Sequence, residues 1–124
     1  MNTEINEVEI NGVKYIRKDS ANQFLPTTKD GYCIVRCVSA GVFFGMVKSC
    51  NLEKGVATIL NARRIWYWSG AASLSQLAVD GTTKPTECKF PCSVERIEVA
   101  QVIEVIPVTQ KSFDSLNSVK VWKQ

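Results

Sequence analysis

No histidine occurs among the 124 residues of the sequence. Histidine is the side chain used most often for acid–base catalysis near neutral pH, and it is also the commonest metal ligand. An enzyme without it needs paired carboxylates, an activated lysine or a reactive cysteine, and no pair stands out among the 12 acidic residues. We therefore expect a protein that is not an enzyme and that uses no cofactor.

The sequence also lacks any apolar segment long enough to span a membrane, and it has neither internal repeats nor low-complexity runs. Its net charge of +3 is modest, and its basic residues are scattered along the chain. Proteins that bind long duplexes normally carry a dense basic stripe. We expect no membrane and no long nucleic acid as partners, although two or three of these charges suffice for a small anionic ligand.

The five cysteines are an odd number, and no basic-then-apolar leader opens the sequence. This combination is typical of reduced thiols in the cytosol. Cys33 and Cys37 share one face of an expected strand about 13 Å apart, too far for a disulfide, and we expect both in the core. A zinc site that adds Cys88 and Cys92 is disfavoured, because three residues separate each pair instead of the commoner two. We expect no metal site.

The N-terminal part of the sequence predicts a β-hairpin. Apolar and polar residues largely alternate from 4 to 10, the pattern resumes from 13 to 17, and Asn11-Gly12 between them is a strong hairpin signal. The length and the 45% hydrophobic fraction suit one core after this hairpin. We expect a hairpin over 1–18, a loop over 19–29 and a single β-rich domain over 30–124.

Apolar runs after this point predict strands at 32–38, 42–48, 56–60 continuing into 61–68, and 97–106. Helical signals predict two short helices, one beginning at Ser73 and one over 109–116, with an exposed loop over 80–91. Gly45 inside a strand predicts a bend or a close approach of backbone. The expected fold is mainly β: an antiparallel curved sheet or partly open small barrel with two short helices.

The most specialised stretch of the sequence is 61–78, which combines two arginines, three aromatic residues, a small-residue turn and a helix start. Side chains in a strand alternate between its two faces. One face of the expected strand therefore carries Ala62, Arg64, Trp66 and Trp68, and the other carries Asn61, Arg63, Ile65 and Tyr67. Each face then has one arginine beside aromatic surface, which favours a flat, anionic ligand.

The helix start in this stretch suggests a place for a phosphate. Ser73 and Gln76 have the spacing of a capping box, and the first turn of a helix presents unpaired N–H groups. The structural interpretation stands beside this one, because tryptophan-rich strands often belong to a core. The candidate ligand-binding residues are Arg63, Arg64, Trp66, Trp68, Ser69, Gly70, Ala71, Ser73 and Gln76.

Segments 62–78, 88–91 and 102–107 resemble a family of small tailed-phage and prophage proteins of unknown function. The likeness runs from about residue 31 to residue 122, and its specific core is Ala-Arg-Arg-Ile-Trp-Tyr-Trp followed by Gly-Ala-Ala-Ser-Leu. The resemblance implies a phage origin and action in the cytoplasm of a host bacterium. It assigns no site residues.

These features favour a non-enzymatic binding protein that sequesters a small nucleotide, such as a bacterial immune signal, and so protects the phage. The arginine–tryptophan surface suits base stacking and phosphate pairing. We also expect a homo-oligomer, because exposed aromatic surface and sheet edges favour association. The alternatives are a protein–protein inhibitor of a host factor, a single-stranded nucleic-acid binder, and a nucleotide hydrolase, which would need a metal site that the spacings do not suggest.

Overall fold

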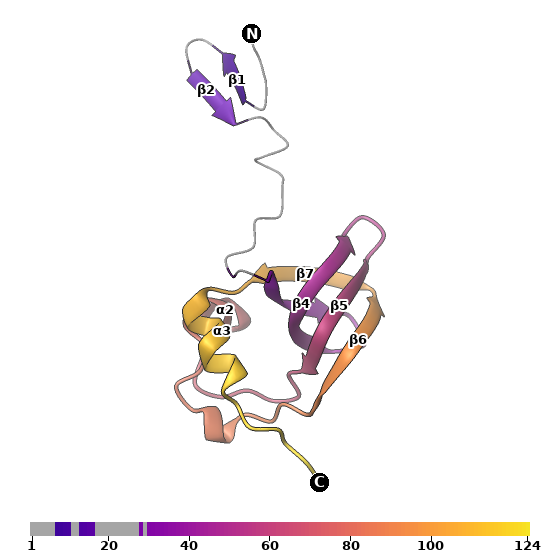
Figure 1. Cartoon of the computed structure of the whole chain (residues 1–124), viewed down its shortest axis with the longest axis vertical. Coiled ribbons are helices and arrows are strands. Elements are labelled where there is room, and N and C mark those ends of the chain that lie inside the picture. Colours follow the sequence, from indigo (N-terminus) through magenta and orange to yellow (C-terminus); the bar gives the residue numbers. More distant parts are fainter. Residues whose placement is uncertain (1–6, 11–12, 17–27, 29) are drawn as a thin grey trace.

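The computed structural model describes residues 7–10, 13–16, 28 and 30–124. It confirms a mainly β fold, with one unclosed curved sheet and two α-helices (Figure 1). In chain order the elements are β1 (Glu7–Ile10), β2 (Val13–Ile16), β3 (Tyr32–Cys37), β4 (Val42–Asn51), β5 (Val56–Arg64), α2 (Leu74–Asp80), the 3-10 helix η1 (Pro85–Glu87), β6 (Ser93–Ala100), β7 (Val102–Pro107) and α3 (Gln110–Asn117).

The predicted N-terminal hairpin is confirmed in its two strands. β1 and β2 pair antiparallel, with Ile10 opposite Val13 at the closed end. The Asn11-Gly12 dipeptide that predicted the turn lies outside the described residues, as does the loop predicted over 19–29 apart from Thr28.

The main sheet has the strand order β6-β5-β4-β3-β7, and all its neighbours are antiparallel. β6 and β7 follow each other in the chain but lie at opposite edges of the sheet (Figure 1). The single strand predicted over 97–106 is therefore wrong. Gln101, with φ of 59°, turns the chain between them. Its carbonyl accepts from Val38 N at 3.0 Å, and Val102 N donates to Gly55 O at 3.0 Å, which holds the corner in place.

The strand predicted over 61–68 is also shorter than expected, because β5 ends at Arg64. Ile65 N still donates to Val42 O of β4 at 2.8 Å. The next two N–H groups, of Trp66 and Tyr67, instead donate to Lys89 O at 3.0 and 3.2 Å. The chain has thus left the sheet for a distant segment, and the expected alternation of faces ends there.

Two apolar cores lie on the two faces of the curved sheet. The inner core includes Cys33 and Cys37, which confirms their predicted burial. The outer core lies between the sheet and the helices, and it contains Ile34, Phe44, Ile65, Leu77, Ala78, Cys88, Phe90, Val108, Leu116 and Val119. Because Cys88 and Phe90 are buried, the segment predicted as an exposed loop over 80–91 is partly core.

Gly45 of β4 confirms the predicted close approach of backbone. A Cβ atom at this position would lie 2.5 Å from Ile59 Cγ2 and 2.9 Å from Leu60 O of the neighbouring strand. Contacts this short force a shift of backbone, so only glycine fits here.

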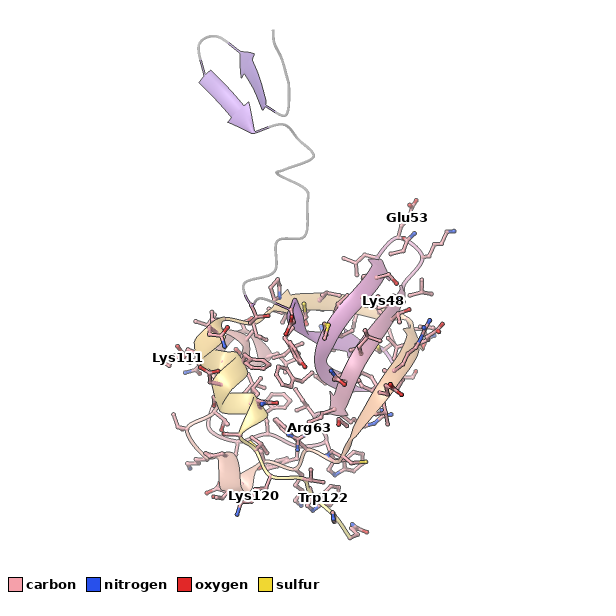
Figure 2. All side chains as sticks on the ribbon, viewed as in Figure 1. Lys48, Glu53, Arg63, Lys111, Lys120 and Trp122 are labelled. Atoms are coloured by element: carbon pink, nitrogen blue, oxygen red, sulfur yellow. The ribbon has the colours of Figure 1, made fainter. Side chains whose placement is uncertain are left out.

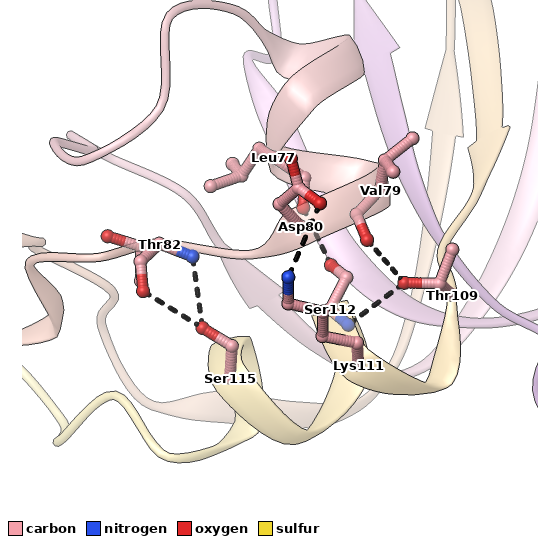
Figure 3. Close-up of polar contacts among 8 residues, drawn as sticks. All are labelled: Leu77, Val79, Asp80, Thr82, Thr109, Lys111, Ser112 and Ser115. Atoms are coloured by element: carbon pink, nitrogen blue, oxygen red, sulfur yellow. Dashed lines mark hydrogen bonds and ion pairs between the residues drawn. The ribbon is translucent and has the colours of Figure 1, made fainter.

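The two helices begin where the sequence predicted. Ser73 caps α2 and Thr109 caps α3, each accepting an N–H from three residues further along. Side chains of α3 then bond the C-terminal part of α2 and the residue that follows its cap (Figure 3). The bonds are Ser112 Oγ to Leu77 O at 2.6 Å, Thr109 Oγ1 to Val79 O at 2.6 Å, Thr82 N to Ser115 Oγ at 2.9 Å, and an ion pair from Lys111 to Asp80 at 3.5 Å. These contacts fix the helix pair over the outer core.

Candidate ligand-binding surface

Arg63, the first predicted site residue, is buried in the interior, with 8% of its surface exposed. Its Nε donates to Pro91 O at 3.1 Å, its Nη1 to Val119 O at 2.8 Å and its Nη2 to Phe90 O at 2.8 Å. The guanidinium also lies 5.3 Å from the centroid of the Phe90 ring. All three acceptors are uncharged carbonyls, and no ion pair with a described carboxylate accompanies them.

This environment defines what Arg63 does. Burial lowers the pKa of Arg63, and the nearby Cys92 acts in the opposite direction. A buried guanidinium is stabilised when its donors are satisfied, and here they join segment 90–91 to the C-terminal tail at Val119 (Figure 2). The geometry gives Arg63 a structural role, with three of its donors directed at the backbone and away from any ligand.

Arg64 points to the other face of the sheet. Its guanidinium carbon lies 4.5 Å from the centroid of the Phe43 ring, and its Nη1 donates to Ala40 O. It borders a small cavity of about 90 Å³ together with Pro91 and Cys92. Arg63 and Arg64 are neighbours in a strand, so their side chains point to opposite faces of the sheet. The two arginines therefore do not converge on one ligand.

The predicted phosphate-binding turn is occupied by its own side chains. Ser73 Oγ accepts from Gln76 N at 3.2 Å, which is the first bond of the predicted capping box, but Gln76 Oε1 accepts at 2.7 Å from Ala72 N, the residue before the cap, and not from Ser73 N. Trp68 is half-buried against the outer core and donates from Nε1 to Ala71 O at 3.3 Å. Ser69 Oγ donates to Glu87 Oε1 at 3.2 Å.

Gly70 packs closely against the segment after α2. A Cβ atom there would lie 2.5 Å from Thr82 Oγ1 and 2.6 Å from Lys84 N. Gly70 and Gln76 line a polar pocket of about 400 Å³ near the end of α2. The predicted residues thus do not form one site: Arg63 lies in the interior, Arg64 beside the small cavity, Trp66 on the surface, and the others around the start of α2.

Trp66 lies on the surface, with 63% of its area exposed. Its ring is parallel to that of Trp122, with an interplanar angle of 9° and centroids 6.4 Å apart. Lys89 Nζ lies 5.6 Å from the Trp122 centroid and 5.9 Å from the centroid of Tyr67, which is also exposed. We call these four side chains, Trp66, Tyr67, Lys89 and Trp122, the aromatic–lysine platform.

Backbone bonds between three distant segments hold the platform in place. Lys89 N donates to Tyr67 O at 2.8 Å, in an antiparallel bridge. Trp122 N donates to Phe90 O at 2.9 Å, beside a parallel bridge between Phe90 and Val121. Because Arg63 bonds Phe90 O and Val119 O beneath them, the buried arginine supports the exposed rings from below.

A groove of about 320 Å³ continues from the platform between η1 and the C-terminal tail. Its walls include Pro85, Cys88, Val121 and Trp122, and Lys120 places a second cation at its edge (Figure 2). The surface therefore combines aromatic faces, two ammonium groups and an apolar trough. Such a set can stack on a flat ring and pair with an anion.

Most of the chain, including part of this surface, matches a known protein family. Residues 30–116 match the model of a domain of unknown function, DUF6948. The chain belongs to this family. No curated protein and no solved structure matches the chain. The DUF6948 match includes Trp66, Tyr67 and Lys89 of the platform, whereas Lys120 and Trp122 lie beyond the matched residues.

Sequence reasoning found Trp66 but missed its neighbours. Lys89 and Trp122 are 23 and 56 positions further along the chain, so no local pattern joins them to Trp66. One signal was present: Lys89 lies within 88–91, one of the segments that carried the family resemblance in the sequence. In this DUF6948 chain, the tail that carries Trp122 comes to Trp66 only through bonds to Phe90 and Arg63.

The thiols and carboxylates of this DUF6948 chain form no comparable site. No three of the described cysteine and acidic side chains cluster in a way that could hold a metal ion. Burial, aided by the charge of Cys50, raises the pKa of the Cys33 thiol to about 12, so this thiol stays protonated at neutral pH. Among the described residues, no helix has the length and apolar character to cross a membrane.

Proposed function

We propose that this protein is a non-enzymatic binding protein that holds a small nucleotide on the aromatic–lysine platform. The observation that carries the proposal is the parallel pair Trp66 and Trp122 with the Lys89 ammonium beside it. Every nucleobase has a π-face that stacks on an aromatic side chain, and every nucleotide has a phosphate that an ammonium attracts. One base on the platform and one phosphate near Lys89 or Lys120 satisfy both groups.

The proposal changes the residues first suggested by the sequence. Trp66 stays in the site, joined by Tyr67, Lys89 and Trp122. Arg63 becomes a support for the site, because its donors are directed at three carbonyls. The other predicted residues stay predictions as ligand contacts.

Binding without turnover is the chemistry that these side chains favour. The platform offers stacking and charge, and its four members include neither a histidine nor a carboxylate. In the setting that the phage-like motif suggests, the protein acts in the cytoplasm of a host bacterium, where it sequesters a nucleotide immune signal.

The test is a titration of the full chain with linear and cyclic nucleotides and short single-stranded oligonucleotides. We expect saturable quenching of tryptophan fluorescence by at least one nucleotide, with mass spectrometry recovering that nucleotide intact. Trp66→Ala and Trp122→Ala should each weaken binding about tenfold to a hundredfold by calorimetry, because stacking on one base is worth about 1–3 kcal/mol.

Matched lysine variants separate the platform from general surface charge. Lys89→Gln should weaken nucleotide binding, whereas Lys111→Gln, which removes the same charge from α3, should not. Unchanged affinity in both tryptophan variants contradicts the proposed site. Conversion of the nucleotide during incubation contradicts binding without turnover, and tighter binding of oligonucleotides than of mononucleotides, with steep salt dependence, favours a single-stranded nucleic-acid binder.

A protein partner is the second candidate, favoured by one observation. Trp66 and Tyr67 of the platform expose 63% and 51% of their surfaces, Val121 in the wall of the groove exposes 45%, and exposed aromatic clusters are enriched in protein interfaces. No response to any nucleotide, together with capture of one host protein that Trp66→Ala abolishes, supports this function instead.

A further inference from the structure

The edge strand β6 is open along its outer side. It has eight residues and pairs with β5, and no other strand of the described chain bonds to it. Edge strands of this length are usually protected by proline, lysine, a bulge or a covering element. The segment 93–100 contains no proline, lysine or positive-φ residue, and its pairing with β5 has no register shift.

The side chains of β6 carry charges of both signs on one face. Arg96 and Glu98 are exposed and bond to each other at 2.8 Å, because residues two apart in a strand share a face. Val94, which lies opposite Ala62 of β5, exposes 44% of its surface. On the other face, Ile97 and Val99 pack against the inner core.

We propose that a second copy of this chain pairs its β6 with this edge, antiparallel, in a two-fold dimer centred on Ile97. A two-fold axis that relates two neighbouring antiparallel strands is perpendicular to the sheet, so every side chain stays on its own face. Residues directly opposite each other share a face, so the axis must pass through a residue position, where a residue lies opposite its own copy, and not between two positions. Centred on Ile97, the pairing places Arg96 opposite Glu98 of the second copy, twice. Val94 then lies opposite Ala100, which joins the exposed apolar surface of the two copies.

The neighbouring registers are electrostatically worse. An axis through Arg96 places two arginines face to face, and an axis through Glu95 or Glu98 places two carboxylates face to face. Like charges directly opposite each other destabilise a strand pair, whereas opposite charges stabilise it. The backbone ladder supplies the affinity of such a dimer, and the charges select the register.

The opposite edge of the sheet does not offer this complementarity. β7 has six residues, ends in Pro107 and contains no basic side chain. Its one carboxylate, Glu104, is bonded to Arg36 of β3 at 2.7 Å. The geometry therefore assigns dimer formation to β6.

The test uses charge reversal and sedimentation or light scattering of the full chain. The natural protein should form a dimer of twice 13.8 kDa. Arg96→Glu and Glu98→Arg should each weaken dimerisation about tenfold or more, because each places four like charges at the seam. An equimolar mixture of the two variants should regain the dimer, since each Glu then faces an Arg, and the double variant with both changes should regain it alone.

A matched control keeps the effect specific to the strand. Glu53→Arg makes the same charge change in the exposed turn between β4 and β5 and should leave dimerisation unchanged (Figure 2). Circular dichroism should show each variant folded, as expected for exposed positions. A monomeric natural protein, variants that dimerise as tightly as the natural protein, or a mixture that stays monomeric overturns the proposal.

Discussion

Two sides of one short segment, residues 63–67, have opposite environments. Arg63 and Ile65 are buried against Phe90 and the C-terminal tail, while Trp66 and Tyr67 are exposed on the surface. Both sides combine a cation with aromatic rings: Arg63 lies over Phe90 inside, and Lys89 lies over Tyr67 and Trp122 outside.

The difference between the two sides is the partner of the cation. Inside, the Arg63 guanidinium donates hydrogen bonds to three backbone carbonyls, so it stabilises the fold. Outside, the Lys89 ammonium approaches ring faces, and no described carboxylate forms an ion pair with it. Residue types alone therefore do not separate a support from a binding surface, whereas an account of hydrogen-bond partners does.

The largest predicted effect is at the buried side. Arg63→Ala should lower the free energy of unfolding by about 3–5 kcal/mol, because it leaves a cavity, removes three hydrogen bonds and takes from the buried Val119 carbonyl its Arg63 donor. Arg64→Ala removes one hydrogen bond and a half-exposed ring contact, and should cost about 1 kcal/mol. Urea denaturation of both variants measures the difference. Equal losses would show that burial does not distinguish the two arginines.

Much of the fold follows from local sequence. The serine at 73, the threonine at 109 and the apolar spacing after them predict both helices, alternation predicts the N-terminal hairpin, and apolar runs predict the strands at 32–38 and 42–48. The corner at Gln101 could not be predicted, because its unusual backbone is fixed by bonds to Val38 and Gly55, which are far along the chain. Long-range bonds override local preference there.

The candidate site was harder to predict than the fold for the same physical reason. Arg63 has its acceptors at Phe90, Pro91 and Val119, and Trp66 has its partner at Trp122. A strand pattern describes which face a side chain takes, but not which distant segment covers that face. The sequence singled out the segment 61–78, and only the fold separates its buried residues from its exposed ones.

The next largest effect concerns the inner core and depends on pH. Burial raises the pKa of Cys33 from 9.0 to about 12, so the folded protein keeps this proton where the unfolded chain loses it. Stability from this group is complete well below pH 9 and declines as the pH rises toward 12, by about 2 kcal/mol between pH 9 and 11. Cys33→Ala should flatten this decline in urea denaturation series. An identical slope in both proteins would contradict it.

Two serine hydroxyls donate hydrogen bonds of equal length, and we expect a smaller difference in stability between their variants. Ser112 Oγ is buried and donates to Leu77 O at 2.6 Å, and Ser118 Oγ is exposed and donates to Ser115 O at 2.6 Å. Ser112→Ala should lower the free energy of unfolding by about 1–2 kcal/mol, since it leaves a buried carbonyl without this donor, and Ser118→Ala by less than about 0.5 kcal/mol. Thermal unfolding followed by circular dichroism distinguishes them, and equal shifts would contradict a burial effect.

On the exposed side of segment 63–67 the expected effect on stability is small. Trp66→Ala should lower the free energy of unfolding by only about 1 kcal/mol, because the ring is mostly in water and loses chiefly its contact with Trp122. If the platform binds a nucleotide, Trp66→Ala should lose far more binding affinity than stability. Arg63→Ala should show the reverse, and its loss of affinity should result from its unfolding. Chemical denaturation measures the stability of both variants, and calorimetry measures their affinity for the nucleotide. A large stability loss in Trp66→Ala would mean that the exposed ring, like Arg63, supports the fold.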